Sequence, residues 1–191
     1  MRTAQGAFTL VELMVVLAII AVLAVLATGW GDTIANNRRS SAINEFVAAI
    51  NQARSEAISR GVAVTICRST DPSAVAPTCN AAAAPGWESG WIIFTDTGVV
   101  GTVDGTDQIL KAHSATPLLT ITGQANPVNN RVSFNPGGTV IVPGAATSNG
   151  TIRFCDSRGF SNASGILARD VALAIGGRIT TKTAPAGGTC P

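Results

Sequence analysis

The sequence has few of the side chains that usually perform catalysis. Its 191 residues include one histidine, His113, and charged residues make up only 13% of the chain. No G-x-S-x-G, Walker loop or H-E-x-x-H motif occurs. His113 has no cysteine or acidic pattern of a hydrolase or metal site near it, so we interpret it as a structural or surface residue. The sequence therefore argues against an enzyme, and we expect no cofactor.

Cysteine is also scarce, and the four cysteines do not form a C-x-x-C motif. They lie at positions 67, 79, 155 and 190, and four cysteines allow three pairings. Proximity in the sequence favours Cys67 with Cys79 and Cys155 with Cys190, and the second pair would hold the C-terminal tail. Zinc binding is a weaker alternative because the spacing does not suit it.

Charge is nearly absent from residues 8–28, where Glu12 is the only side chain that can carry one. A helix of about 20 apolar residues rises about 30 Å and can cross a bilayer. The preceding residues 1–7 carry Arg2, and no A-x-A cleavage site follows the apolar run. The sequence therefore predicts a membrane segment with a cytoplasmic start and an exported remainder.

Glu12 is unusual within this apolar segment. A carboxylate in a membrane helix costs roughly 2.5 to 3.5 kcal/mol when it is central and less near an end. Such a side chain normally has a partner and a function. A single-pass anchor that merely tolerates the acid is the simpler alternative.

The stretch GAFTLVEL, followed by an apolar helix, resembles the class III signal of type IV pilins and pseudopilins. The resemblance implies a leader of residues 1–7, removed by a prepilin peptidase between Ala7 and Phe8, and methylation of the new N-terminus. The residue before the cut is usually Gly, whereas Gly6 here lies one place further back. Glu12 would then be the fifth residue, as in the family, and would pair with the N-terminal amine of a neighbouring subunit during assembly.

Residues 29–61 are predicted to continue as an amphipathic helix. A break is expected near Gly29, because glycine costs about 1 kcal/mol relative to alanine inside a helix. Beyond it, apolar residues at three- and four-residue spacing form one stripe that should face a core. Glu56 and Arg60 should pair, and Gly61 should end the helix. The stripe comprises Ile43, Phe46, Val47, Ile50, Ala53 and Ala57.

Residues 62–191 are predicted to form one domain built on an antiparallel sheet. Asn135-Pro136-Gly137-Gly138 and Gly176-Gly177 indicate turns, and residues 71–90 and 157–168 indicate long loops. The predicted strands cover residues 62–68, 91–95, 108–112, 118–122, 131–134, 139–142, 151–155, 170–175 and 178–181.

Three further segments, ARSEAISRGVAVTIC, WESGWIIFTD and GGRI, resemble the GspH/FimT/FimU branch of the pilin family. The resemblance implies an α+β, type IV pilin-like fold with a long N-terminal helix on an antiparallel β-sandwich. It also implies a minor pilin or a minor pseudopilin of type II secretion, held in the bacterial inner membrane before it joins a filament of other pilins. The two predicted disulfides favour the FimT/FimU pilins.

DNA is a possible partner, because some FimT-type pilins bind it through a Gly-Arg-x-Arg motif in the C-terminal tail. Gly177-Arg178-Ile179-Thr180 keeps the first arginine and lacks the second. Residues 131–191 carry a net charge of +4. The candidate phosphate contacts are Arg178 and Lys182, supported by Arg153, Arg158 and Arg169. A solvated tail is the alternative.

Acidic residues at Asp96, Asp104 and Asp107 raise the question of a calcium site. Their spacing does not match an EF-hand loop. A solvated turn is therefore the default interpretation, and we predict no metal site.

Overall fold

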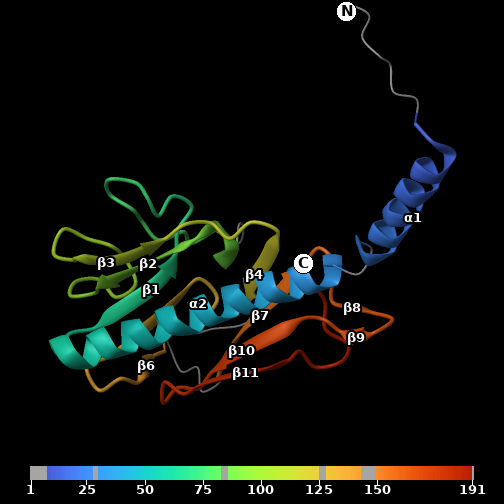
Figure 1. The fold of residues 1–191 in the computed structure, drawn as a ribbon. Coiled ribbons are helices and arrows are strands. Elements are labelled where there is room, and N and C mark those ends of the chain that lie inside the picture. Colours follow the sequence, from blue (N-terminus) through green and yellow to red (C-terminus); the bar gives the residue numbers. More distant parts are fainter. Residues whose placement is uncertain (1–7, 28–29, 83–85, 125–127, 143–148, 191) are drawn as a thin grey trace, which may run out of the picture. The chain divides into compact units, whose positions relative to one another are not determined.

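The computed structural model describes residues 8–27, 30–82, 86–124, 128–142 and 149–190, and the chain divides into two compact units, 1–38 and 39–191 (Figure 1). Helix α1 (Leu10–Ala27) lies in the first unit, and α2 is formed by Trp30–Arg60. The predicted break falls at Gly29, which is outside the described residues, as is Thr28 at the end of the predicted membrane segment. Among the described residues, no helix combines the length and apolarity needed to cross a membrane.

The domain that follows contains two larger antiparallel sheets (Figure 1). One has the order β3 (Ile109–His113), β2 (Trp91–Thr95), β1 (Val64–Arg68), β5 (Arg131–Phe134), β6 (Val140–Ile141). The other has the order β11 (Ile179–Thr183), β10 (Arg169–Leu173), β7 (Gly150–Asp156), β4 (Leu119–Gly123). A 3-10 turn, η1 (Trp87–Ser89), precedes β2. The predicted fold class, an α+β pilin-like fold, is confirmed.

Each predicted strand is present, with ends within two residues of those expected. The structure adds a short hairpin, β8 (Ser161–Asn162) with β9 (Gly165–Ile166), where residues 157–168 were predicted to be a loop. These strands have two residues each, so they are too short to show the alternation of apolar and polar residues that identifies a strand.

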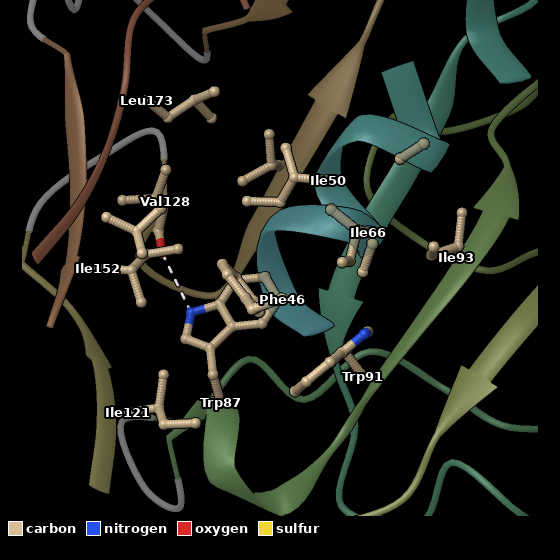
Figure 2. Packing of buried hydrophobic residues seen from close by; sticks show 14 of the residues in the cluster. Phe46, Ile50, Ile66, Trp87, Trp91, Ile93, Ile121, Val128, Ile152 and Leu173 are labelled. Atoms are coloured by element: carbon tan, nitrogen blue, oxygen red, sulfur yellow. Dashed lines mark hydrogen bonds between the residues drawn. The ribbon is translucent and has the colours of Figure 1, made fainter. Parts of the chain in front are cut away.

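The core forms where one face of α2 packs against both sheets (Figure 2). Phe46 is fully buried, and its ring makes edge contacts with Trp87, Trp91 and Phe154 at centroid distances of 5.1, 5.3 and 5.7 Å. Trp87 Nε1 donates to the Val128 carbonyl at 3.2 Å. The predicted stripe is therefore the core face: its residues are buried except Val47, which is partly buried.

Two tight turns connect the sheets to α2 through Arg54. Gly138 and Gly177 have φ values of +75° and +79°, which glycine adopts without a steric penalty. The Arg54 guanidinium donates to the carbonyls of Gly138, Gly176 and Gly177 at 2.9, 3.2 and 3.3 Å. The Val140 N–H also donates to the Ile175 carbonyl at 2.8 Å, which joins the ends of the two sheets.

Each sheet carries a small second core on the face that points away from α2. Cys67 is bonded to Cys79 and packs with Ile92 and Phe94 on the five-stranded sheet. Cys155 is bonded to Cys190, and this disulfide packs with Ala168, Ala184, Phe160 and Ile166. These are the pairings that proximity in the sequence favours, and the second one holds the C-terminal tail.

Replacing Phe46 with Ala should destabilise the protein by about 3 to 5 kcal/mol, because the change removes a fully buried ring between three other aromatic rings. Chemical denaturation of the full chain in detergent micelles, followed by tryptophan fluorescence, measures this. Val75→Ala is the matched control, since Val75 is fully exposed and its truncation should cost less than about 0.5 kcal/mol. Equal midpoints for the two variants would contradict the assigned core.

Candidate functional site

The start of α1 is formed by a capping arrangement that the sequence Thr9-Leu10-Val11-Glu12 encodes. The Thr9 hydroxyl accepts the Glu12 backbone N–H at 3.2 Å, and the Thr9 carbonyl accepts the Leu13 N–H at 3.2 Å. Thr9 therefore caps the helix, with Glu12 at the third helical position. A carboxylate in the first turn is favourable at the positive end of the helix dipole. The capping pattern T-x-x-E was readable from the sequence and our sequence analysis missed it.

The described side chains of α1 form an exposed apolar surface. The large hydrophobic residues from Leu10 to Leu23 are 48 to 74% exposed, and Phe8 is 81% exposed. A continuous apolar surface of this kind is costly in water and marks a region that lipid or another protein covers. Glu12 is exposed among these residues, and Ala7 lies outside the described residues.

The predicted basic patch does not assemble, because Arg153 is buried. Only 7% of Arg153 is exposed, and its guanidinium forms a bidentate ion pair with Asp170 at 2.9 and 3.1 Å. The same group donates to the Thr189 carbonyl at 3.3 Å and lies 5.3 Å from the centre of the Phe160 ring. Hydrogen bonds from Arg153 to Asp170 raise the pKa of the guanidinium further. Arg153 thus ties the C-terminal tail to β7.

Arg158 and Arg169 are also engaged within the domain. Arg158 forms an ion pair with Asp156 at 2.6 Å, and Arg169 donates to the Thr183 hydroxyl. Arg178 and Lys182 alone of the five candidates are exposed. The structure therefore offers two exposed cations at the predicted DNA site.

Asp156 also accepts a bond at 2.7 Å from Arg39 of α2, and both side chains are buried. Hydrogen bonding from Arg158, the largest cause, lowers the pKa of Asp156. Burial lowers the pKa of Arg39, because desolvation disfavours its charge. The sequence analysis missed this Arg39–Asp156 bond between α2 and β7, since the partners lie 117 positions apart.

In the acidic loop that follows β2, carboxylates accept hydrogen bonds from backbone N–H groups of the same loop. Asp104 accepts N–H groups from Val99 and Thr106, and Asp107 accepts those from Thr97 and Asp104. Across the described residues, no group of three or more acidic, histidine or cysteine side chains is placed to hold a metal. These hydrogen bonds fit the turn that the sequence predicts.

Asp96 lies under this loop and is buried. Its Oδ2 accepts hydrogen bonds from the Thr65 hydroxyl and from the Gly101 N–H at 2.7 Å. Its Oδ1 is buried without a partner among the described residues. Burial is the largest cause of a raised pKa at Asp96, so the fold favours the neutral carboxyl.

His113 has a packing role. Its ring stacks on Trp91 at a centroid distance of 3.9 Å and an interplanar angle of 6°. Its Nε2 lies 3.1 Å from Glu45 Oε2, and its Nδ1 lies 2.6 Å from the Ser114 carbonyl. The histidine thus connects β3, β2 and α2.

Two family matches cover most of the chain. Residues 42–177 match the family described as Type II transport protein GspH, and residues 2–28 match the prokaryotic N-terminal methylation motif. The chain belongs to the GspH family. It is therefore a minor pilin or pseudopilin, a structural protein without catalytic activity, as the sequence predicted. The methylation motif implies processing by prepilin peptidase, assembly with other pilins, and passage from the inner membrane to the filament.

Solved structures of one minor pilin share this fold. The type IV minor pilin FimU of Pseudomonas aeruginosa matches in two crystal forms. The first is 21% identical with a TM-score of 0.52, covering 81% of this chain and 93% of that chain. The second is 20% identical with a TM-score of 0.51, covering 79% and 96%. The minor pseudopilin EpsH of the Vibrio cholerae type 2 secretion system is 9% identical with a TM-score of 0.47, covering 76% and 97%. No curated protein matches.

Asp96→Asn should give a GspH-family domain that is at least as stable as the unmodified one at pH 7. The amide oxygen can accept the same two hydrogen bonds without a buried charge. The pKa of Asp96 is raised in the folded protein, so its neutral carboxyl contributes favourably to the free energy of unfolding at low pH. This contribution is lost as the pH rises through the folded pKa. The advantage of the variant should therefore shrink as pH falls towards 4, an ordinary Asp value of about 3.9.

Urea unfolding of both proteins across this pH range measures the difference. A variant that is less stable at pH 7 by the same amount at every pH would show that burial of Asp96 does not control this pH dependence.

Proposed function

We propose that the protein is a minor type IV pilin of the FimT/FimU kind, incorporated into the pilus through its N-terminal helix. One observation carries the proposal: Glu12 stands alone in the exposed apolar surface of α1, inside the matched methylation motif. The likeness in fold to FimU, which is a type IV minor pilin, supports the choice. A minor pseudopilin of a type II secretion system is the alternative, favoured by the description of the matched family.

The proposed cut between Ala7 and Phe8 would place a new amine immediately before the Thr9 cap. This positive charge would stand at the positive end of the α1 dipole, which is unfavourable without a nearby anion. Glu12 lies one turn away and is exposed. A Glu12 carboxylate from a neighbouring subunit can neutralise the amine where water is absent, and the pairing offsets the cost of burying either charge alone.

Before assembly, residues 8–28 would hold the chain in the inner membrane with residues 39–191 in the periplasm. The two disulfides support this location, since the bacterial periplasm is oxidising. The apolar side chains of α1 would then exchange lipid for the α1 helices of neighbouring subunits. This exchange requires no large change in solvation, because both surroundings are apolar.

DNA binding receives less support as a second function. Arg153 and Arg158 are held in ion pairs within the domain, and Arg169 is half-buried and donates to Thr183, so Arg178 and Lys182 are the exposed candidates for phosphate contact. Two phosphate contacts would give a weak, salt-sensitive affinity. The C-terminal tail itself is pinned by the Cys155–Cys190 disulfide.

Glu12→Ala should reduce incorporation into filaments at least about tenfold, because an unpaired amine would be left in an apolar core. Each variant is expressed in a strain that lacks the gene for this protein. The amount of the protein in sheared filaments is then compared with the amount in membranes by immunoblot. Glu56→Ala is the matched control, since it removes a half-buried acid that pairs with Arg60 on α2 and leaves α1 unchanged. Equal incorporation of the Glu12 variant and the unmodified chain would refute the assembly role.

The same deletion strain shows whether the protein serves a type IV pilus or a type II secretion system. Loss of surface pili with normal protein secretion supports the minor pilin. Loss of secretion with normal pili supports the pseudopilin and overturns the leading proposal.

A further inference from the structure

Strand β11 is the outer strand of its sheet and pairs with β10 on one side (Figure 1). The Ala174 N–H donates to the Arg178 carbonyl, and the Ala184 N–H donates to the Ala168 carbonyl. In an antiparallel pair these bonds alternate, so Thr180 and Lys182 turn their backbone groups towards β10. The N–H and C=O groups of Ile179, Thr181 and Thr183 therefore point away from the sheet, and no described residue bonds to them.

Two of the other sheet edges are partly closed. At β4, the Ile121 N–H donates to Glu88 Oε2 at 2.8 Å. At β6, the Val140 N–H donates to the Ile175 carbonyl at 2.8 Å. Proteins usually protect edge strands by such contacts or by proline, bulges, charged side chains or short length, and of these devices β11 has one charged side chain, Lys182. β11 has five residues in regular register, with neither proline nor bulge.

The surroundings of this open edge are basic. A cavity of about 200 Å³ lies between α2 and the edge of the sheet, and Arg169 lines it together with Ser40, Asn44 and Thr181. The Arg169 guanidinium donates to the Thr183 hydroxyl, and no described carboxylate bonds to it. On the opposite face of β11, Lys182 is exposed, and its cross-strand neighbour Asp170 is held by Arg153. Hydroxyl, amide and guanidinium groups together suit an oxygen anion.

We propose that β11 accepts an extended acidic segment of another protein chain as an additional strand. The segment pairs with the backbone of Ile179, Thr181 and Thr183, and one of its carboxylates enters the cavity beside Arg169. A second carboxylate on the opposite face meets Lys182, because alternate side chains of a strand point to opposite faces. The proposal goes beyond the assembly role of α1, because it concerns residues 39–191 and holds for either kind of filament.

The chemistry favours a polypeptide over DNA as the occupant. Phosphates could meet Arg178 and Lys182, which are exposed, but they would leave the outward N–H and C=O groups without partners of matching spacing. A β-strand supplies hydrogen-bond donors and acceptors in the required alternation. The basic side chains beside β11 then favour a strand with an acidic sequence.

The probe is a fluorescent peptide of about eight residues, in which threonine, valine and glutamate alternate along the sequence. It is titrated into the full chain in detergent micelles, and its binding is measured. Thr181→Pro should weaken binding at least about tenfold, because it removes an outward N–H and leaves the bonds to β10 in place. Thr181→Val, which keeps the N–H, should stay within about twofold. Arg169→Gln should weaken the acidic peptide and leave a glutamine-substituted peptide unaffected.

A second probe needs no variant of the protein. The same peptide with alternate backbone nitrogens methylated keeps its charge and loses its hydrogen-bond donors, so its affinity should fall at least about tenfold. Thermal unfolding checks that Thr181→Pro remains folded.

Several results would overturn the proposal. Absence of peptide binding, or equal binding of the methylated peptide, would exclude strand pairing. Equal binding of a DNA oligonucleotide and the peptide, both unaffected by Thr181→Pro, would indicate simple charge attraction. Self-association of the chain that Thr181→Pro abolishes would assign the edge to a second copy.

Discussion

The domain depends on the burial of one face of α2 between two antiparallel sheets. Phe46 lies at the centre of this contact, against Trp91 of the five-stranded sheet, Phe154 of the four-stranded sheet and Trp87 of η1, which lies beside β4. Figure 2 shows Phe46 with Trp87 and Trp91. Each sheet has an apolar face that must be buried against another element, and α2 packs against both of these faces. Arg54 and Arg39 then fix the helix to the ends of strands through hydrogen bonds and an ion pair.

The disulfides have a different role from that of the central core. Each one attaches an outer layer to a sheet: the loop that follows β1 on one sheet and the C-terminal tail on the other. The tail in turn covers the Arg153–Asp170 ion pair. Of the charged groups that the sequence suggests as a nucleic-acid surface, Arg153 thus holds the tail and Arg158 pairs with Asp156. The open edge of β11 lies beside cations that stay accessible.

The central parts of the fold were predictable because they follow from local patterns. The spacing of Ile43, Phe46 and Ile50 defines a buried helix face, and short β-branched runs between Gly and Pro define the main strands. The Arg39–Asp156 bond and the partner of Arg153 were not predictable, because the sequence does not state which strands are neighbours. One signal was available: an arginine in the apolar run Thr151-Ile152-Arg153-Phe154 must be paired if it is buried.

The central claim is that residues 8–28 form a processed assembly helix with Glu12 as its only charged side chain. The most direct test is mass spectrometry of the protein isolated from its native membranes, with the N-terminal peptide sequenced. The account predicts a chain that begins at Phe8 and carries a methyl group on its amine. A mature chain that retains residues 1–7, or one that is cut after residue 28, would contradict it.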